Sequence, residues 1–128
     1  MAGAIRELVQ HIATVHPEYD RDGMLDAIYA QEKRMNTGIM PGIAVPHGRY
    51  APVSRVMGAV GISPAGIPYG APDGKPVHIV FMLFTDNVSH GEHLSVFRQL
   101  LLLLKSPYAL RLREARTPQE VYNVLARY

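Results

Sequence analysis

The chain has 128 residues, which is the size of one domain and is long enough to form a hydrophobic core. Hydrophobic residues make up 48% of it and charged residues 19%, a balance typical of a globular protein and not of a disordered chain or a coiled coil. Thirteen Lys and Arg residues against eleven Asp and Glu give a net charge of +2, which is too weak to indicate a nucleic-acid partner.

The sequence also shows no sign of a membrane-spanning segment or of disulfide bonds. No apolar run is long enough to span a bilayer, and the N-terminus does not have the pattern of a signal peptide. The chain contains no cysteine, which excludes disulfide bonds and thiolate metal sites. We therefore expect a cytoplasmic protein.

Two helices are predicted in the first part of the chain. The first spans about residues 4–14, and the second follows the polar segment 19–22, which offers an N-cap, and ends between Arg34 and Asn36. The apolar positions that recur at helical spacing and should face the core are Ile5, Leu8, Val9 and Ile12 in the first helix and Met24, Leu25, Ile28 and Tyr29 in the second.

The segment 37–49, with the sequence TGIMPGIAVPHGR, places a histidine at the end of a stiff, extended stretch. Pro46 fixes its own φ and favours an extended conformation in the residue before it. Gly48 has no Cβ, so another molecule's backbone or a phosphate could come close to the imidazole of His47, and Arg49 adds a permanent cation two residues away. From these residues alone, a reactive His47 and an ordinary loop histidine are both consistent with the pattern.

Two strands are predicted next. Residues 53–62 form a strand with both faces covered, and the segment 63–75, rich in Gly and Pro, forms a loop. The segment 76–84 is almost wholly apolar and rich in β-branched and aromatic residues, which predicts a central strand. His78 lies among core residues of this strand, which favours a hydrogen-bonded structural role.

Helices are predicted for most of the remaining chain. A polar loop over 85–92 leads into an apolar helix over 93–104, and Ser106 and Pro107 then begin a short helix that ends near Ala115. Thr117 begins the last helix, whose inward positions are Val121, Tyr122, Val124 and Leu125. Strands that alternate with helices in one small domain indicate an α/β sandwich.

The segment TGIMPGIAVPHGR resembles the phosphohistidine motif of enzyme IIA domains of sugar phosphotransferase systems, in the fructose, mannitol and nitrogen-regulatory class. The resemblance continues to the end of the chain. It implies a three-layer α/β sandwich, with a mixed β-sheet, helices on both faces and a site at strand ends. Because the family has further chain before the first helix, we expect residues 1–128 to form a single enzyme IIA-like domain that lacks the usual N-terminal segment.

The resemblance also implies the roles of individual residues. His47 would be the phosphorylated nucleophile, and phosphoryl transfer mainly requires positioning and charge stabilisation. His93, just before Leu94 at the start of a helix, matches the family's second histidine and would support the phosphoryl oxygens beside the helix N-terminus. A first-turn surface histidine is the alternative for His93. Further supporting positions are Thr37, Gly48 and Arg49.

The sequence differs from the family pattern in two places: at Gln31, and at Met40 and Pro41, which replace the small, usually glycine-containing residues of the loop before the histidine. The family has Arg-Glu sixteen residues before the reactive histidine, whereas this sequence has Gln31 and Glu32. A neutral amide thus stands where a guanidinium would stabilise phosphoryl charge, and the residues that could substitute are Lys33, Arg34 and Arg49. These departures bear on transfer competence and not on the fold.

Three classes of function follow. The leading one is a phosphotransferase with a phosphohistidine intermediate, which accepts a phosphoryl group from an HPr-like carrier protein and passes it to the IIB domain of a membrane permease. The second is a regulatory domain, nitrogen-branch or transporter-associated, that binds a target protein according to its phosphorylation state, and Gln31 favours it. Neither needs a cofactor, a metal or a nucleic acid, and membrane association would be indirect. The third is a metal enzyme using His47, His90, Glu92 and His93, although the sequence has no H-E-x-x-H pattern.

Overall fold

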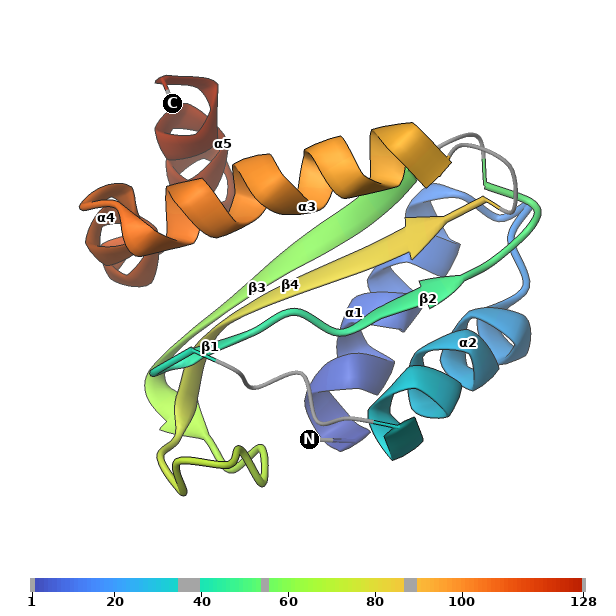
Figure 1. Ribbon diagram of the computed structural model, residues 1–128, viewed down its shortest axis with the longest axis horizontal. Coiled ribbons are helices and arrows are strands. Elements are labelled where there is room, and N and C mark those ends of the chain that lie inside the picture. The colour runs from blue at the N-terminus through green and yellow to red at the C-terminus, as the bar shows by residue number, and fades with distance from the viewer. Residues whose placement is uncertain (1, 35–39, 54–55, 87–89, 128) are drawn as a thin grey trace.

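The computed structural model describes residues 2–34, 40–53, 56–86 and 90–127 and has a β-sheet between two layers of helices (Figure 1). The helices are α1 (Ala2–Val15), α2 (Arg21–Arg34), α3 (His90–Lys105), α4 (Tyr108–Glu114) and α5 (Pro118–Arg127). α1 and α2 cover one face of the sheet, and α3 runs across the other face, with α4 and α5 following at its C-terminal end. The predicted three-layer α/β sandwich is confirmed. Within the described residues, no helix is both long and apolar enough to cross a membrane.

The sheet is organised around β4 (Val77–Thr85), the strand predicted to be central. β1 (Ile43–Ala44) and β2 (His47–Arg49) pair with it in parallel, and both pair at the same register offset. β3 (Val56–Ile67) pairs with β4 in antiparallel fashion. β1 and β2 therefore behave as one strand interrupted at residues 45–46, and the sheet is mixed, as predicted.

Successive side chains along the strands point to opposite faces of the sheet and so contribute to two hydrophobic cores, one under each helix layer. The core on the α3 side includes Ile79, Phe81 and Leu83 of β4, with Val56, Val60 and Ile62 of β3 packed against it. The core on the α1 and α2 side includes Met82 and Phe84 of β4, with Met57 and Ala59 of β3. Both faces of β3 are thus covered, as the sequence predicted.

Most element boundaries lie within one to three residues of the predictions, and two differences change which residues belong to an element. β3 continues to Ile67, where a loop was predicted, because the pairing resumes after a register shift between Ile62 and Ile67. Gly66 lies within this irregular part at φ +85°, a conformation that other residues rarely adopt. α3 begins at His90 and not at residue 93, so Gly91, expected in a loop, lies in the first helical turn.

The predicted inward face of α5 is wrong at one position. Val121, Val124 and Leu125 pack against the core on the α3 side, and their i, i+3, i+4 spacing defines the buried stripe. Tyr122 is 66% exposed because it lies beside this stripe and not on it.

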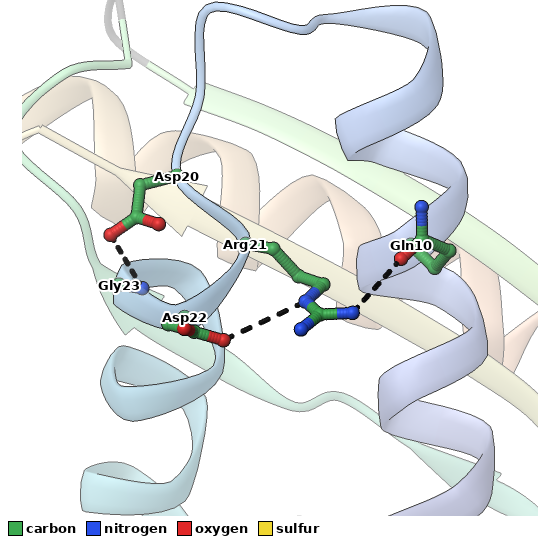
Figure 2. Close-up of polar contacts among 5 residues, drawn as sticks. All are labelled: Gln10, Asp20, Arg21, Asp22 and Gly23. Atoms are coloured by element: carbon green, nitrogen blue, oxygen red, sulfur yellow. Dashed lines mark hydrogen bonds and ion pairs between the residues drawn. The ribbon is translucent and has the colours of Figure 1, made fainter.

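The corner between α1 and α2 is held by a cap and by surface contacts (Figure 2). The Asp20 side chain accepts a hydrogen bond from the Gly23 N–H at 3.1 Å, so the N-cap predicted in the segment 19–22 is present. Arg21 donates to the Gln10 side chain at 3.4 Å and lies 3.6 Å from the Asp22 carboxylate. The bond to Gln10 ties the first turn of α2 to α1.

His78 has the structural role that its position predicted. Its Nδ1 lies 2.9 Å from the carbonyl oxygen of Ser63, and its Nε2 lies 3.0 Å from Nη2 of Arg113. Because a guanidinium only donates hydrogen bonds, Nε2 is the acceptor and Nδ1–H donates to Ser63. The imidazole therefore links β3 and α4 through the central strand.

Candidate functional site

The imidazole of His47 is fixed by the backbone just before it. His47 is the first residue of β2, and its Nδ1 lies 2.8 Å from the carbonyl oxygen of Val45. A carbonyl oxygen can only accept, so Nδ1 carries the proton in this bond. The neutral ring then has its lone pair on Nε2, which is the nucleophilic nitrogen.

The accepting carbonyl of Val45 lies in the interruption between β1 and β2. The N–H of Leu83 donates to the carbonyl oxygen of Pro46 at 2.9 Å, which keeps the chain attached to β4 through the break. Pro46 itself has no N–H to contribute to a ladder. The local geometry follows from the V-P-H order of residues 45–47.

Aromatic packing orients the same ring from α3. The rings of His47 and Phe97 lie with centroids 5.0 Å apart at an interplanar angle of 70°, an edge-to-face contact. His47 is half-buried as a result. Its χ angles are therefore restricted by both the Val45 carbonyl and the Phe97 ring.

Gly48 packs against α2. A Cβ at this position would lie 2.6 Å from the carbonyl oxygen of Ala27. The missing side chain thus makes room for α2, a contact that the sequence alone did not predict. The close approach brings the helix directly against β2.

A pocket of about 660 Å³ lies beside β2, between α2 and α3. It is lined by Ala30, Gln31 and Arg34 of α2, by His47, Gly48 and Arg49 of β2, by Thr85 of β4, and by Leu94 and Phe97 of α3. It reaches the carboxyl ends of β2 and β4, as expected, but it also extends along the edge of β2. Among these described lining residues, two are arginines and none is a carboxylate. A pocket of this charge suits an anion.

The family is decided by a match over almost the whole chain. The family model described as "Phosphoenolpyruvate-dependent sugar phosphotransferase system, EIIA 2" matches residues 2–128. The chain belongs to this enzyme IIA family.

Relatives of this enzyme IIA domain include both nitrogen-regulatory and sugar-specific proteins. It is 30% identical over 122 residues to the "Nitrogen regulatory protein" of Pseudomonas aeruginosa, and the aligned region covers 94% of this chain and 79% of the relative. It is 33% identical over 125 residues to the "PTS system fructose-specific EIIA component" of Haloferax volcanii, with coverage of 97% and 81%.

Solved structures of both kinds share the fold. The nitrogen regulatory protein IIA-Ntr from Neisseria meningitidis superposes with a TM-score of 0.77 and 31% identity, over 84% of this chain and 75% of that one. A chain of the Escherichia coli complex of enzyme IIAMTL and phosphorylated enzyme IIBMTL superposes with a TM-score of 0.71 and 25% identity, over 98% and 87%.

Most of the residues singled out in the sequence of this IIA domain meet at the pocket. His47, Gly48, Arg49 and Gln31 all line it. Thr37 lies outside the described residues. The backbone of His93 lies in α3, four residues before Phe97, whereas its side chain is outside the described part of the structure.

Some lining residues were not singled out for the site from the sequence, and Arg34 was named only as a possible substitute for the family's arginine. Helical spacing relates Arg34 and Phe97 to the expected site, since Arg34 lies three residues after Gln31 and Phe97 four residues after His93. Thr85 carries no such mark, because only strand pairing places it near β2. The partner of His47 is the main-chain carbonyl of Val45, so the type of residue at position 45 gives no indication of the bond.

The metal-enzyme alternative depends on four side chains, of which the structure describes only that of His47. His90, Glu92 and His93 all lie in α3, but their side chains are not described. Among the described residues, no group of three or more His, Asp or Glu could hold a metal ion.

Proposed function

We propose that this enzyme IIA domain carries a phosphoryl group on Nε2 of His47, as a phosphotransferase with a phosphohistidine intermediate. The observation that carries the proposal is the hydrogen bond from Nδ1–H to the Val45 carbonyl, in a pocket that two arginines make cationic. This bond leaves the second ring nitrogen unprotonated, as a nucleophile must be.

The transfer step balances without an external base. The Nε2 lone pair forms a bond to phosphorus while the bond from phosphorus to the donor's leaving atom breaks, and that atom keeps the electron pair. No proton has to leave Nε2, because the ring proton is on Nδ1 and stays bonded to the Val45 oxygen. The reverse step, onto an acceptor, uses the same geometry with the roles exchanged.

Charge stabilisation is the other requirement of phosphoryl transfer, since charge spreads over three oxygens in the transition state. Arg49 follows His47 by two residues on β2, so strand alternation places both on one face. Gln31 contributes a neutral amide from α2. We assign His93 the role of a second donor to the phosphoryl oxygens, and we assign a supporting role to Thr37, which precedes β1 in the sequence.

The proposed partners are an HPr-like phosphocarrier protein as donor and a IIB domain as acceptor. The fold similarity to the complex of enzyme IIAMTL and phosphorylated enzyme IIBMTL supports the acceptor. Leu94, 70% exposed at the pocket, offers a partner an apolar contact beside His47. No cofactor takes part in this chemistry, and association with a permease would place the domain at a membrane only indirectly, from the cytoplasm.

A regulatory role is the second candidate. It is favoured by the similarity to nitrogen regulatory proteins and by Gln31, whose neutral amide adds no charge to stabilise a transferring phosphoryl group. The chemistry at His47 is the same in both roles. They differ in whether a IIB domain removes the phosphoryl group or a target protein recognises its presence.

The deciding experiment combines phosphoenolpyruvate, enzyme I and HPr with this domain and follows its intact mass. We expect the gain of one acid-labile phosphoryl group, absent in His47→Ala. The Gln31→Arg variant should gain the group faster, because it adds a cation to the same pocket. Addition of a IIB domain then separates the two roles: rapid discharge supports the carrier, and a persistent phosphorylated form supports regulation. A wild-type chain that gains no phosphoryl group would overturn both.

A further inference from the structure

We propose, building on the function above, that Arg34 is a catalytic residue that binds the phosphoryl oxygens in the His47 pocket. Arg34 is the last residue of α2 and lines the pocket with Gln31. Neither arginine of the pocket, Arg34 or Arg49, forms a salt bridge within the described part of the chain. Within those described residues, no carboxylate therefore competes with an anion for either guanidinium group.

The geometry of α2 selects Arg34 over its neighbour. Positions 27, 30, 31 and 34 follow the i, i+3, i+4, i+7 spacing of one helix face. This face begins at the contact of Ala27 with Gly48 and continues with the residues of α2 that line the pocket. Lys33 is exposed and lies two residues from Gln31, so it is on another face and does not line the pocket.

A partly buried hydrogen bond holds the last turn of α2 in place. The hydroxyl of Tyr69 donates to the Glu32 carboxylate at 2.8 Å, and Tyr69 is only 2% exposed. Glu32 stands between Gln31 and Arg34 on the same turn. Although the Arg34 side chain is exposed, it extends from a helical turn that is anchored to the core.

Two arginines reach the pocket from different elements, Arg34 from α2 and Arg49 from β2. A guanidinium forms paired hydrogen bonds to phosphate oxygens, which a neutral amide cannot match in charge. A phosphoryl group on His47 would thus be flanked by cations from two sides. This arrangement supplies from Arg34 the charge that Gln31 does not.

The first arm of the test measures binding of inorganic phosphate through the NMR resonances of the His47 imidazole. We expect Arg34→Gln to weaken binding about tenfold and Arg34→Lys to recover part of it, as loss of one close charge predicts. Lys33→Gln is the matched control, because it removes the same charge from the same turn, and it should change binding less than about twofold. Equal effects of Arg34→Gln and Lys33→Gln would overturn the proposal.

The second arm measures the rate of phosphorylation of His47 by phosphoramidate, a donor too small to dock on the protein surface, and by phosphorylated HPr. Slower transfer from both donors in Arg34→Gln supports a contact with the phosphoryl group. Slower transfer from HPr alone assigns Arg34 to partner docking and overturns the proposal. If the wild type binds phosphate through Arg34 but accepts no phosphoryl group, the proposed carrier function fails while the anion site remains.

Discussion

The contact between β2 and α2 makes Gly48→Ala a sharp test of the site's architecture. The added methyl carbon would lie 2.6 Å from the carbonyl oxygen of Ala27, 2.7 Å from its carbonyl carbon and 3.0 Å from its Cβ. Because the obstacle is helix backbone, the clash is relieved only if α2 moves away from the strand. Overpacking of this kind costs about 1–3 kcal/mol of unfolding free energy. At roughly 4 °C per kcal/mol, we expect Tm to fall by about 4–12 °C.

Urea unfolding followed by far-UV circular dichroism measures this loss, and Gly3→Ala is the matched control. A Cβ at Gly3 meets nothing within 4 Å, so the same substitution on α1 should leave stability unchanged or raise it by up to about 1 kcal/mol. Movement of α2 also carries Arg34 away from His47, so phosphate binding should weaken in Gly48→Ala. Equal stability of the two variants, with unchanged phosphate binding, would refute the packing that we describe.

Three further substitutions test separate contacts. Asp20→Ala removes the N-cap of α2 and should cost about 1 kcal/mol in urea unfolding, whereas Asp20→Asn should retain most of the stability; equal losses would argue against a cap. Tyr69→Phe removes the donor to Glu32 without changing the packing and should lower unfolding free energy by about 1–2 kcal/mol, and wild-type stability in this variant would contradict the partly buried bond. Phe97→Leu keeps an apolar contact but loses the edge-to-face alignment with His47, so phosphoryl acceptance should slow by about three- to tenfold with stability nearly constant; an unchanged rate would show that the ring needs no such support.

The layers of the fold could be predicted from the sequence because burial leaves periodic marks. The apolar run of β4 and the helical spacing in α1 specify two covered faces, and the structure agrees. The end of β3 could not be predicted, since Gly and Pro residues favour a loop unless tertiary pairing continues beyond them. Pairing between Ile67 and Val77 provides this continuation. Tyr122 was wrongly assigned to the buried face of α5 because it is apolar and adjacent in sequence to the buried Val121. The apolar pattern alone does not show which of two neighbouring apolar residues faces the core.

The site was predictable where the chain places residues close together in sequence. The V-P-H-G-R segment contains the proposed nucleophile His47, its backbone partner and one cation, and in the structure His47 is bonded to that partner and lines a pocket with Arg49. Contributions from α2, β4 and α3 depend on tertiary packing. Gly48 illustrates the limit, since the same missing Cβ fits a close approach by a ligand or by a helix. Only the three-dimensional arrangement identifies α2 as the neighbour.

The bond from His47 to the Val45 carbonyl has a consequence for how the domain tolerates mutation. In a histidine oriented by a carboxylate, one substitution at the partner destroys the tautomer. Here the partner is main chain, and any residue at position 45 that keeps the extended conformation retains the same oxygen. The position of the ring proton on His47 is thus insulated from side-chain variation around it. If His47 carries the phosphoryl group as proposed, residues at the rim of the pocket, such as Gln31, can change and alter the rate or the choice of partner while Nε2 stays unprotonated.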